Sequence, residues 1–104
     1  MQQGTLPTAL ITFNDDVAVS AMGMLNQAGI EMPGQMSVVG WDDSVTAALS
    51  PVPLTSVAQR PAELAQLALE RIVARLEHRR LESHQIVLAP ELRIRSSTQA
   101  VESV

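Results

Sequence analysis

Two short apolar runs in this chain each stop abruptly on polar residues, and a helical pattern lies between them. The first run, residues 8–13, is followed by Asn14, and the second, residues 36–41, is followed by Asp42. Between the runs, small and apolar residues recur at helical spacing over residues 15–28. Strand, helix and strand in this order form the unit from which parallel sheets are built. We therefore predict an α/β fold, with a parallel sheet and flanking helices.

Asn14 and Asp42 are the first candidate binding residues. Ligands of open parallel sheets bind in the crevice outside the carboxyl ends of the strands, where both residues are expected. The amide of Asn14 offers a donor and an acceptor, and the carboxylate of Asp42 offers two acceptors, which suits a polyol or a base. Each residue also has a local alternative, because Asn14 is a suitable helix cap and Asp42 is able to cap a short turn at residues 44–49.

The remaining elements are shorter, apart from one long helix. Pro61 is placed at the first helical position, where proline is tolerated, and the helix is predicted to run to about Arg80. Its wide apolar face needs a sizeable partner. We also predict a helical turn at residues 44–49 and strands at residues 54–58, 85–88 and 91–95.

Phe13 and Trp41 are the only aromatic residues, and each precedes one of the polar clusters. An aromatic ring in this position is able to stack on the apolar face of a sugar. Packing between sheet and helix is the favoured interpretation for each of them.

Charge is unevenly distributed along the 104 residues. Residues 1–59 hold five acids and no Lys or Arg, whereas residues 60–104 hold seven Arg and six acids. A surface that binds nucleic acid needs clustered cations, so we do not expect these residues to bind DNA directly. The basic cluster of Arg75, Arg79 and Arg80 suits the negative end of the long helix better than a phosphate site.

The chain has no cysteine, and its two histidines are His78 and His84. Thiolate sites are therefore excluded, and both histidines are interpreted as solvated surface residues rather than metal ligands. We predict neither a metal site nor a cofactor. No apolar stretch approaches the roughly 20 residues needed to cross a bilayer, and no membrane segment is expected.

The adjacent acids Asp42 and Asp43 also suggest a magnesium-dependent phosphoryl-transfer domain, such as a receiver domain or a phosphatase. That chemistry needs a cation near the phosphate, and the chain has no lysine to supply it. Neither a nucleophile elbow nor a glycine-rich phosphate loop is present. The prediction is that the chain is not an enzyme, with phosphoryl transfer as the less favoured alternative.

A series of short motifs runs through the chain from residue 7 to about residue 98. They are Pro7-Thr8-Ala9, Phe13-Asn14-Asp15, Ala28-Gly29-Ile30, Pro33, the run from Ser37 to Asp43, the run from Pro53 to Val57, Gln59, Pro90-Glu91-Leu92, and the run from Arg95 to Thr98. Each motif is weak alone, but their joint order and spacing resemble the lactose-repressor/galactose-repressor family of bacterial transcriptional regulators.

The resemblance implies a sensor lobe similar to periplasmic sugar-binding proteins. Asn14 and Asp42 match positions that hydrogen-bond the effector, and Gln59 matches a position near the crossing between lobes. The resemblance also implies a homodimer formed by the helix at residues 15–28 and the segment after Asp43. The expected effector is a sugar or a related small metabolite.

The same resemblance implies a domain organisation. The chain is expected to be the C-terminal part of the effector-binding and dimerisation domain, with the lobe core at about residues 5–58. Residues 59–82 would then be a helix packing on a first lobe, residues 83–98 returning strands, and residues 99–104 a tail.

A DNA-binding domain and a first lobe would lie outside this sequence, so DNA is expected to be contacted only through that other domain. Such a regulator acts in the cytoplasm. A periplasmic sugar-binding transport receptor is the alternative of the same shape. Without a first lobe, the apolar face of the long helix is expected to fold back or to pair with a second copy, and effector binding is expected to be weak or lost.

Overall fold

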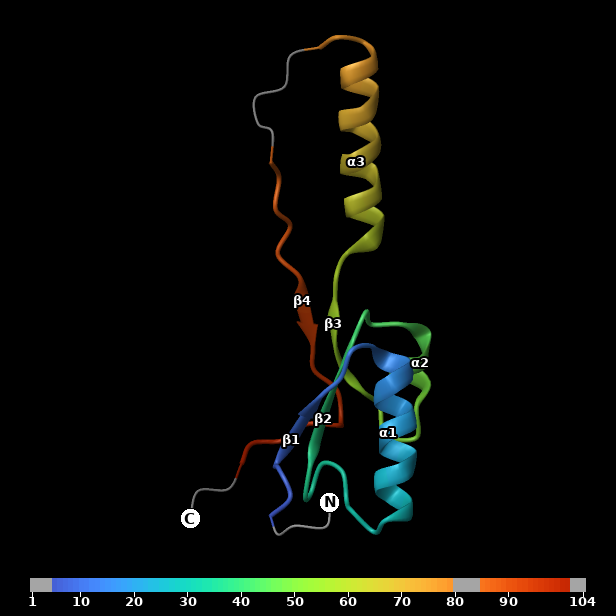
Figure 1. The fold of residues 1–104 in the computed structure, drawn as a ribbon, viewed down its shortest axis with the longest axis vertical. Coiled ribbons are helices and arrows are strands. Elements are labelled where there is room, and N and C mark those ends of the chain that lie inside the picture. The colour runs from blue at the N-terminus through green and yellow to red at the C-terminus, as the bar shows by residue number, and fades with distance from the viewer. Residues whose placement is uncertain (1–4, 80–84, 102–104) are drawn as a thin grey trace. The chain divides into compact units, whose positions relative to one another are not determined.

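The computed structural model describes residues 5–79 and 85–101, which form two units. The first unit contains residues up to 58 together with residues from 92 onward, and the second contains residues 59–91. The alternation of strands and helices predicted from the sequence is confirmed (Figure 1). None of the helices in the described ranges is long and apolar enough to cross a membrane.

The first unit opens with the predicted strand, helix and strand. These are β1 (Ala9–Ile11), α1 (Asp15–Gln27) and β2 (Ser37–Trp41). The two strands are parallel neighbours, and Ile11 is paired with Val39. The chain continues into α2 (Val45–Leu49) and β3 (Thr55–Ala58), and β3 is parallel to β2.

Helix α1 is held at both ends by the residues that the sequence pattern indicated. The side chain of Asn14 accepts a hydrogen bond from the Val17 N–H at 2.9 Å, which satisfies one of the free donors at the helix start. After the helix, Gly29 adopts a φ of 80°, a left-handed conformation that glycine reaches without strain. One stripe of α1, which includes Ala18, Met22 and Leu25, is buried in the core.

The sheet has the order β1-β2-β3-β4, and its last strand is β4 (Glu91–Arg93). Strand β4 runs in the opposite direction to β3 in Figure 1. The strand predicted at residues 85–88 is wrong, because the structure has no strand there. A strand needs a neighbour to satisfy its backbone groups, and within the described part of the second unit these residues pair with no other strand.

The segment after β4 is joined to the sheet through Ser97, whose side chain is fully buried. Its hydroxyl donates to the Val38 carbonyl at 2.6 Å and accepts from the Thr55 N–H at 2.8 Å. The Ser97 carbonyl also accepts from the Val38 N–H at 2.9 Å. These bonds fix residues near 97 against both β2 and the start of β3.

The second unit contains α3 (Pro61–Leu76), with proline at its first turn as predicted. The helix ends at Leu76, earlier than the predicted Arg80, because the chain turns into a left-handed conformation at His78. The N–H of Arg79 then bonds back to the Ala74 carbonyl at 2.9 Å, as in a helix C-cap. Several large apolar side chains of α3 are exposed, namely Leu64, Leu69, Ile72, Val73 and Leu76.

The core of the first unit requires glycine at position 40 of β2. A Cβ atom there would lie 2.7 Å from Leu54 Cδ2 and would overlap Asp15 Oδ1. Leu54 is fully buried and Asp15 is 2% exposed, so neither neighbour has free space into which it is able to move. A Cβ atom at Gly23, on α1, would meet nothing within 4 Å, and Gly23 has an ordinary helical conformation.

We predict opposite effects of alanine at these two glycines. Gly40→Ala should lower the free energy of unfolding by about 1–3 kcal/mol through overpacking. Gly23→Ala, the matched control, should raise it by about 0.5–1 kcal/mol because alanine is the better helix former. Urea unfolding followed by far-ultraviolet circular dichroism measures both, and equal stabilities for the two variants would contradict the packing at Gly40.

Candidate functional site

The carboxyl ends of β1 and β2 lie at the same edge of the sheet, and a predicted binding residue follows each strand. Ile11 pairs with Val39, and the next backbone bond, from the Thr12 N–H to the Val39 carbonyl, measures 3.0 Å. Asn14 and Asp42 follow these paired residues at equal separations along the chain. The structure therefore places both residues after neighbouring strand ends.

Asn14 uses one half of its side chain for local structure. Its Oδ1 atom caps α1 through the Val17 N–H, and its backbone carbonyl accepts from the Ala18 N–H at 3.0 Å. The Asn14 side chain is partly buried. The cap leaves the amide nitrogen as the part of Asn14 that is suited to meet a ligand.

Asp42 and Asp43 form a strained turn at the end of β2. Asp42 has a φ of 103° and Asp43 a φ of 51°, both in the region that favours glycine. Strained backbone of this kind costs about 1–3 kcal/mol per residue and clusters at functional sites. The Asp42 N–H bonds to the Val57 carbonyl at 2.9 Å, so the turn begins from a regular strand pair, and Asp42 itself is exposed.

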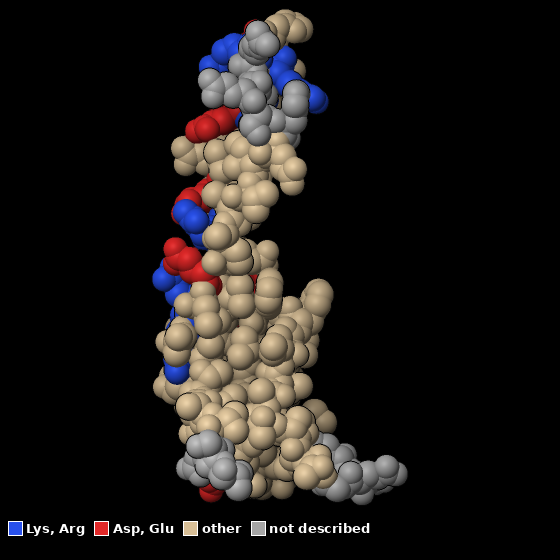
Figure 2. All heavy atoms as spheres, turned by 90° about the vertical axis from the view of Figure 1, so that its left-hand side faces the viewer, with Lys and Arg blue, Asp and Glu red and all other residues tan. Residues whose placement is uncertain are grey.

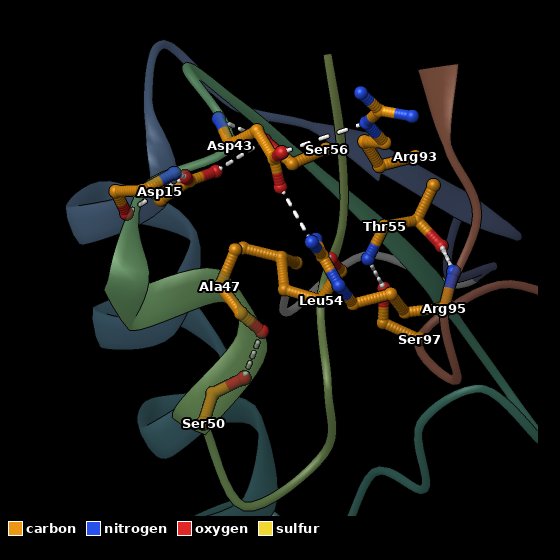
Figure 3. A network of polar contacts seen from close by, with 11 residues as sticks. Asp15, Asp43, Ala47, Ser50, Leu54, Thr55, Ser56, Arg93, Arg95 and Ser97 are labelled. Atoms are coloured by element: carbon orange, nitrogen blue, oxygen red, sulfur yellow. Dashed lines mark hydrogen bonds and ion pairs between the residues drawn. The ribbon is translucent and has the colours of Figure 1, made fainter. Parts of the chain in front are cut away.

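The carboxylate of Asp43 is held by arginine. Arg95 Nη2 donates to Asp43 Oδ1 at 2.6 Å, and Arg93 Nε lies 3.7 Å from Asp43 Oδ2 (Figure 3). A second nitrogen of Arg95, Nη1, donates to the Leu54 carbonyl at 2.8 Å. Asp43 thus forms a structural ion pair with Arg95. This arrangement gives the magnesium-dependent phosphoryl-transfer alternative no support.

Asp15 is the main polar residue of the site that the sequence did not reveal. The sequence pattern placed it in the first turn of α1, where a carboxylate suits the helix dipole, and it occupies that turn. It is also 2% exposed and accepts from the Ser44 N–H at 2.6 Å and the Ser44 hydroxyl at 2.8 Å. Its other oxygen accepts from the Ser56 hydroxyl at 2.6 Å (Figure 3). Because these partners are remote in sequence, the local sequence pattern gave no sign of this role.

Gln59, the third predicted binding residue, lies at the start of the second unit and is exposed. It follows β3 directly and precedes Arg60, which has a φ of 58°. Arg60 pairs with Glu63, and the side-chain hydrogen bond to Glu63 raises the pKa of the Arg60 guanidinium. Gln59 therefore comes after the carboxyl end of a third strand, while Asn14 and Asp42 belong to the first unit.

The two aromatic residues next to the site differ in exposure. Phe13 is 84% exposed, so the predicted packing between sheet and helix is wrong for this ring. The reason is that Phe13 comes two residues after Ile11, which is the last residue of the edge strand β1 and is itself 71% exposed. Trp41 is 38% exposed and remains partly packed.

Most of the first unit on the face shown in Figure 2 is uncharged. At the end of α3, Arg79 pairs with Glu77 at 2.9 Å, and His78 is exposed. The predicted surface residues His84 and Arg80 lie outside the described residues. Among the residues that the structure describes, no group of three or more His, Cys, Asp or Glu side chains is arranged to hold a metal ion.

The family described as periplasmic binding protein-like domain matches residues 1–98 of the chain. The chain belongs to this family. The match includes all the strands of the sheet described above and every predicted binding residue, and it confirms the periplasmic-binding-protein-like fold expected from the motifs.

Relatives in this periplasmic binding protein-like family include named regulators. The chain is 31% identical over 96 residues to the arabinose metabolism transcriptional repressor of Geobacillus stearothermophilus, covering 91% of this chain and 26% of that protein. It superposes on a LacI family transcriptional regulator from Lactobacillus casei with bound sucrose, with a TM-score of 0.76, 33% identity, and coverage of 88% and 34%.

A lac repressor dimer bound to operator and the anti-inducer ONPF gives a TM-score of 0.83 at 29% identity, covering 91% of this chain and 33% of that one. These similarities confirm the resemblance to the lactose-repressor/galactose-repressor family. The chain spans about a quarter to a third of the length of these relatives.

We predict that Asp15→Asn lowers the free energy of unfolding by about 2 kcal/mol or more, because the amide nitrogen is unable to accept the hydrogen bonds from Ser44 or Ser56 that a carboxylate oxygen accepts. Asp16→Asn is the matched control, since Asp16 is exposed in the same helical turn and both changes remove one charge from the helix start. The control should stay within about 0.5 kcal/mol of the parent chain. Thermal unfolding at neutral pH measures the stability of both variants. Equal losses of stability would show that the interaction with the helix dipole alone accounts for the contribution of Asp15.

Proposed function

We propose that this chain is the effector-sensing and dimerisation part of a LacI-type transcriptional regulator. Its effector is a sugar or a related small metabolite, bound by Asn14, Asp42 and Gln59. Effector binding changes the relation between two lobes and thereby the affinity for DNA. DNA is contacted through a separate N-terminal domain, and the protein works in the cytoplasm.

The observation that carries this proposal is the register of β1 and β2. It puts the residues after both strands at one edge of a parallel sheet, which is where such folds bind ligands. The amide nitrogen of Asn14 is a donor and the Asp42 carboxylate is an acceptor, so together they complement a sugar hydroxyl pair. The bound sucrose of the Lactobacillus casei regulator supports a sugar as the ligand class.

The strained backbone of Asp42 supports the same assignment. An aspartate at a φ of 103° is less stable than glycine would be at that position. The strain is explained if the carboxylate is needed for binding. Exposed Phe13, next to Asn14, adds an aromatic ring of the kind that stacks on sugars.

Dimerisation is proposed through α1 and the segment after Asp43. Met24 of α1 is 72% exposed, and Val45 and Leu49 of α2 are 74% and 76% exposed. The two helices are packed against each other in the first unit (Figure 1). Exposed apolar side chains on two helices that pack together are typical of a surface that a second copy covers.

Residues 59–82 are proposed to contact a first lobe, followed by the returning segment at residues 83–98 and a tail at residues 99–104. The exposed apolar residues of α3 support a partner for that helix. The separate clustering of residues 59–91 supports a boundary near Gln59.

We predict that Asp42→Ala removes the response to a sugar. The test is a chimera in which residues 7–98 replace the matching segment of the Lactobacillus casei regulator that holds sucrose. Its thermal shift should respond to at least one member of a panel of sugars that includes sucrose, and the Asp42→Ala chimera should lose that response.

Asp16→Ala is the control for this experiment, because it removes an exposed acid elsewhere in the same unit. Nucleobases and magnesium complete the panel. An unchanged sugar response in Asp42→Ala would remove the site assignment, and a magnesium response dependent on Asp42 and Asp43 would favour phosphoryl transfer.

We predict that Leu49→Glu weakens self-association of the chain roughly tenfold or more, because it would place a charge in the proposed dimer interface. Leu69→Glu is the control, since Leu69 is a similarly exposed leucine of α3 at 63%. Sedimentation equilibrium measures both dissociation constants. If only Leu69→Glu separates the copies, self-association occurs through α3 and the proposed dimer surface is wrong.

A further inference from the structure

The turn at Asp42 and Asp43 is held by hydrogen bonds with side chains in three distant parts of the first unit. These side chains are Asp15 at the start of α1, Ser56 in β3, and Arg95 after β4. None of them was predicted to belong to a binding site. Their contacts fall on the residues that immediately follow Asp42 (Figure 3).

Ser56 is the centre of this arrangement. Its side chain is fully buried, and its oxygen accepts from the Asp43 N–H at 2.9 Å. The same hydroxyl donates its proton to Asp15 Oδ1 at 2.6 Å. A hydroxyl has one proton to give, so Asp15 determines the direction of that proton and leaves the oxygen lone pairs facing Asp43.

Asp15 and Arg95 hold the two sides of the turn. The second oxygen of Asp15 accepts both the N–H and the hydroxyl of Ser44, at 2.6 and 2.8 Å. Arg95 links the Asp43 carboxylate, at 2.6 Å, to the Leu54 carbonyl, at 2.8 Å. The backbone on the carboxyl side of Asp42 is thereby fastened through both Asp43 and Ser44.

The backbone on the amino side of Asp42 is held by the sheet. The Asp42 N–H bonds to the Val57 carbonyl at 2.9 Å, and Trp41 is paired with Val57. Left-handed conformations at two successive aspartates persist only where the surroundings over-determine them. The sheet on one side and the three side chains on the other provide that constraint.

We propose that Ser56, Asp15 and Arg95 are positioning residues that fix the direction of the Asp42 carboxylate towards the ligand. This inference rests on the proposed function, in which Asp42 binds the effector. In this role the three residues act on the ligand through the turn. They keep the turn in its strained form before a ligand arrives, so that binding does not have to order it.

The first test needs no ligand and uses the 104-residue chain. Ser56→Ala should speed hydrogen exchange of the Asp42 amide about tenfold or more, because the turn loses the bond that closes it. Trp41, the only tryptophan, should show a changed emission and stronger acrylamide quenching. Ser50→Ala is the matched control, because it removes a hydroxyl bonded to the Ala47 and Val52 carbonyls, away from the turn.

A second variant covers the case in which Ser56→Ala does not fold. Arg95→Gln removes an arginine whose side chain is 24% exposed, so the core remains filled. Its Asp42 amide should also exchange several-fold faster. Arg79→Gln, which breaks an exposed pair on α3, is its control. Asp42 exchange in Arg95→Gln that equals that of its control would overturn the proposal.

The second test uses the same chimera and the sugar of the panel that gives it the largest thermal shift. Ser56→Ala should weaken binding of that sugar about tenfold with the chimera still folded, whereas Ser50→Ala should not change it. If Asp42→Ala abolishes binding and Ser56→Ala leaves it unchanged, the positioning role is wrong. If Asp42→Ala leaves sugar binding unchanged while Ser56→Ala still speeds exchange of the Asp42 amide, the proposed function fails and the contacts serve the fold alone.

Discussion

The buried carboxylate of Asp15 is the interaction on which the first unit depends. It lies against Gly40 in the middle of the sheet and takes three hydrogen bonds, from the backbone and hydroxyl of Ser44 and the hydroxyl of Ser56. A buried charge is tolerated only when its hydrogen-bonding capacity is met. The start of α1, the start of α2 and strand β3 are consequently tied to one point beneath the candidate site.

In the proposed site, the residues that hold the turn differ from the residues proposed to bind the effector. The carboxylate of Asp15 accepts hydrogen bonds from serine side chains within the unit. The carboxylate of Asp43 accepts from the Arg95 guanidinium. Asn14 uses its Oδ1 atom for a helix cap. Asp42 lies exposed on a backbone that its neighbours keep in a strained form. Two adjacent acids that are alike in sequence therefore have different surroundings, since Asp43 bonds to Arg95 and Asp42 is exposed.

Sequence periodicity predicted the parallel strands and α1, because local preference and core burial agree there. Asn14 is the clearest case, since a cap depends only on its nearest neighbours. The buried role of Asp15 was not predictable in this way, because its partners come from 29 and 41 residues further along the chain. The strand at residues 85–88 and the packing of Phe13 failed for a related reason, as both depend on which neighbours are present.

The bonds made by Ser97 set an order for folding during synthesis. Val38 and Thr55 are made long before Ser97, and the second unit is inserted between β3 and the segment that carries this serine. Contacts of such wide sequence separation form late, because a large loop must first be closed. On the ribosome, the sheet of the first unit therefore has to wait with an unfinished edge until the whole second unit has been translated.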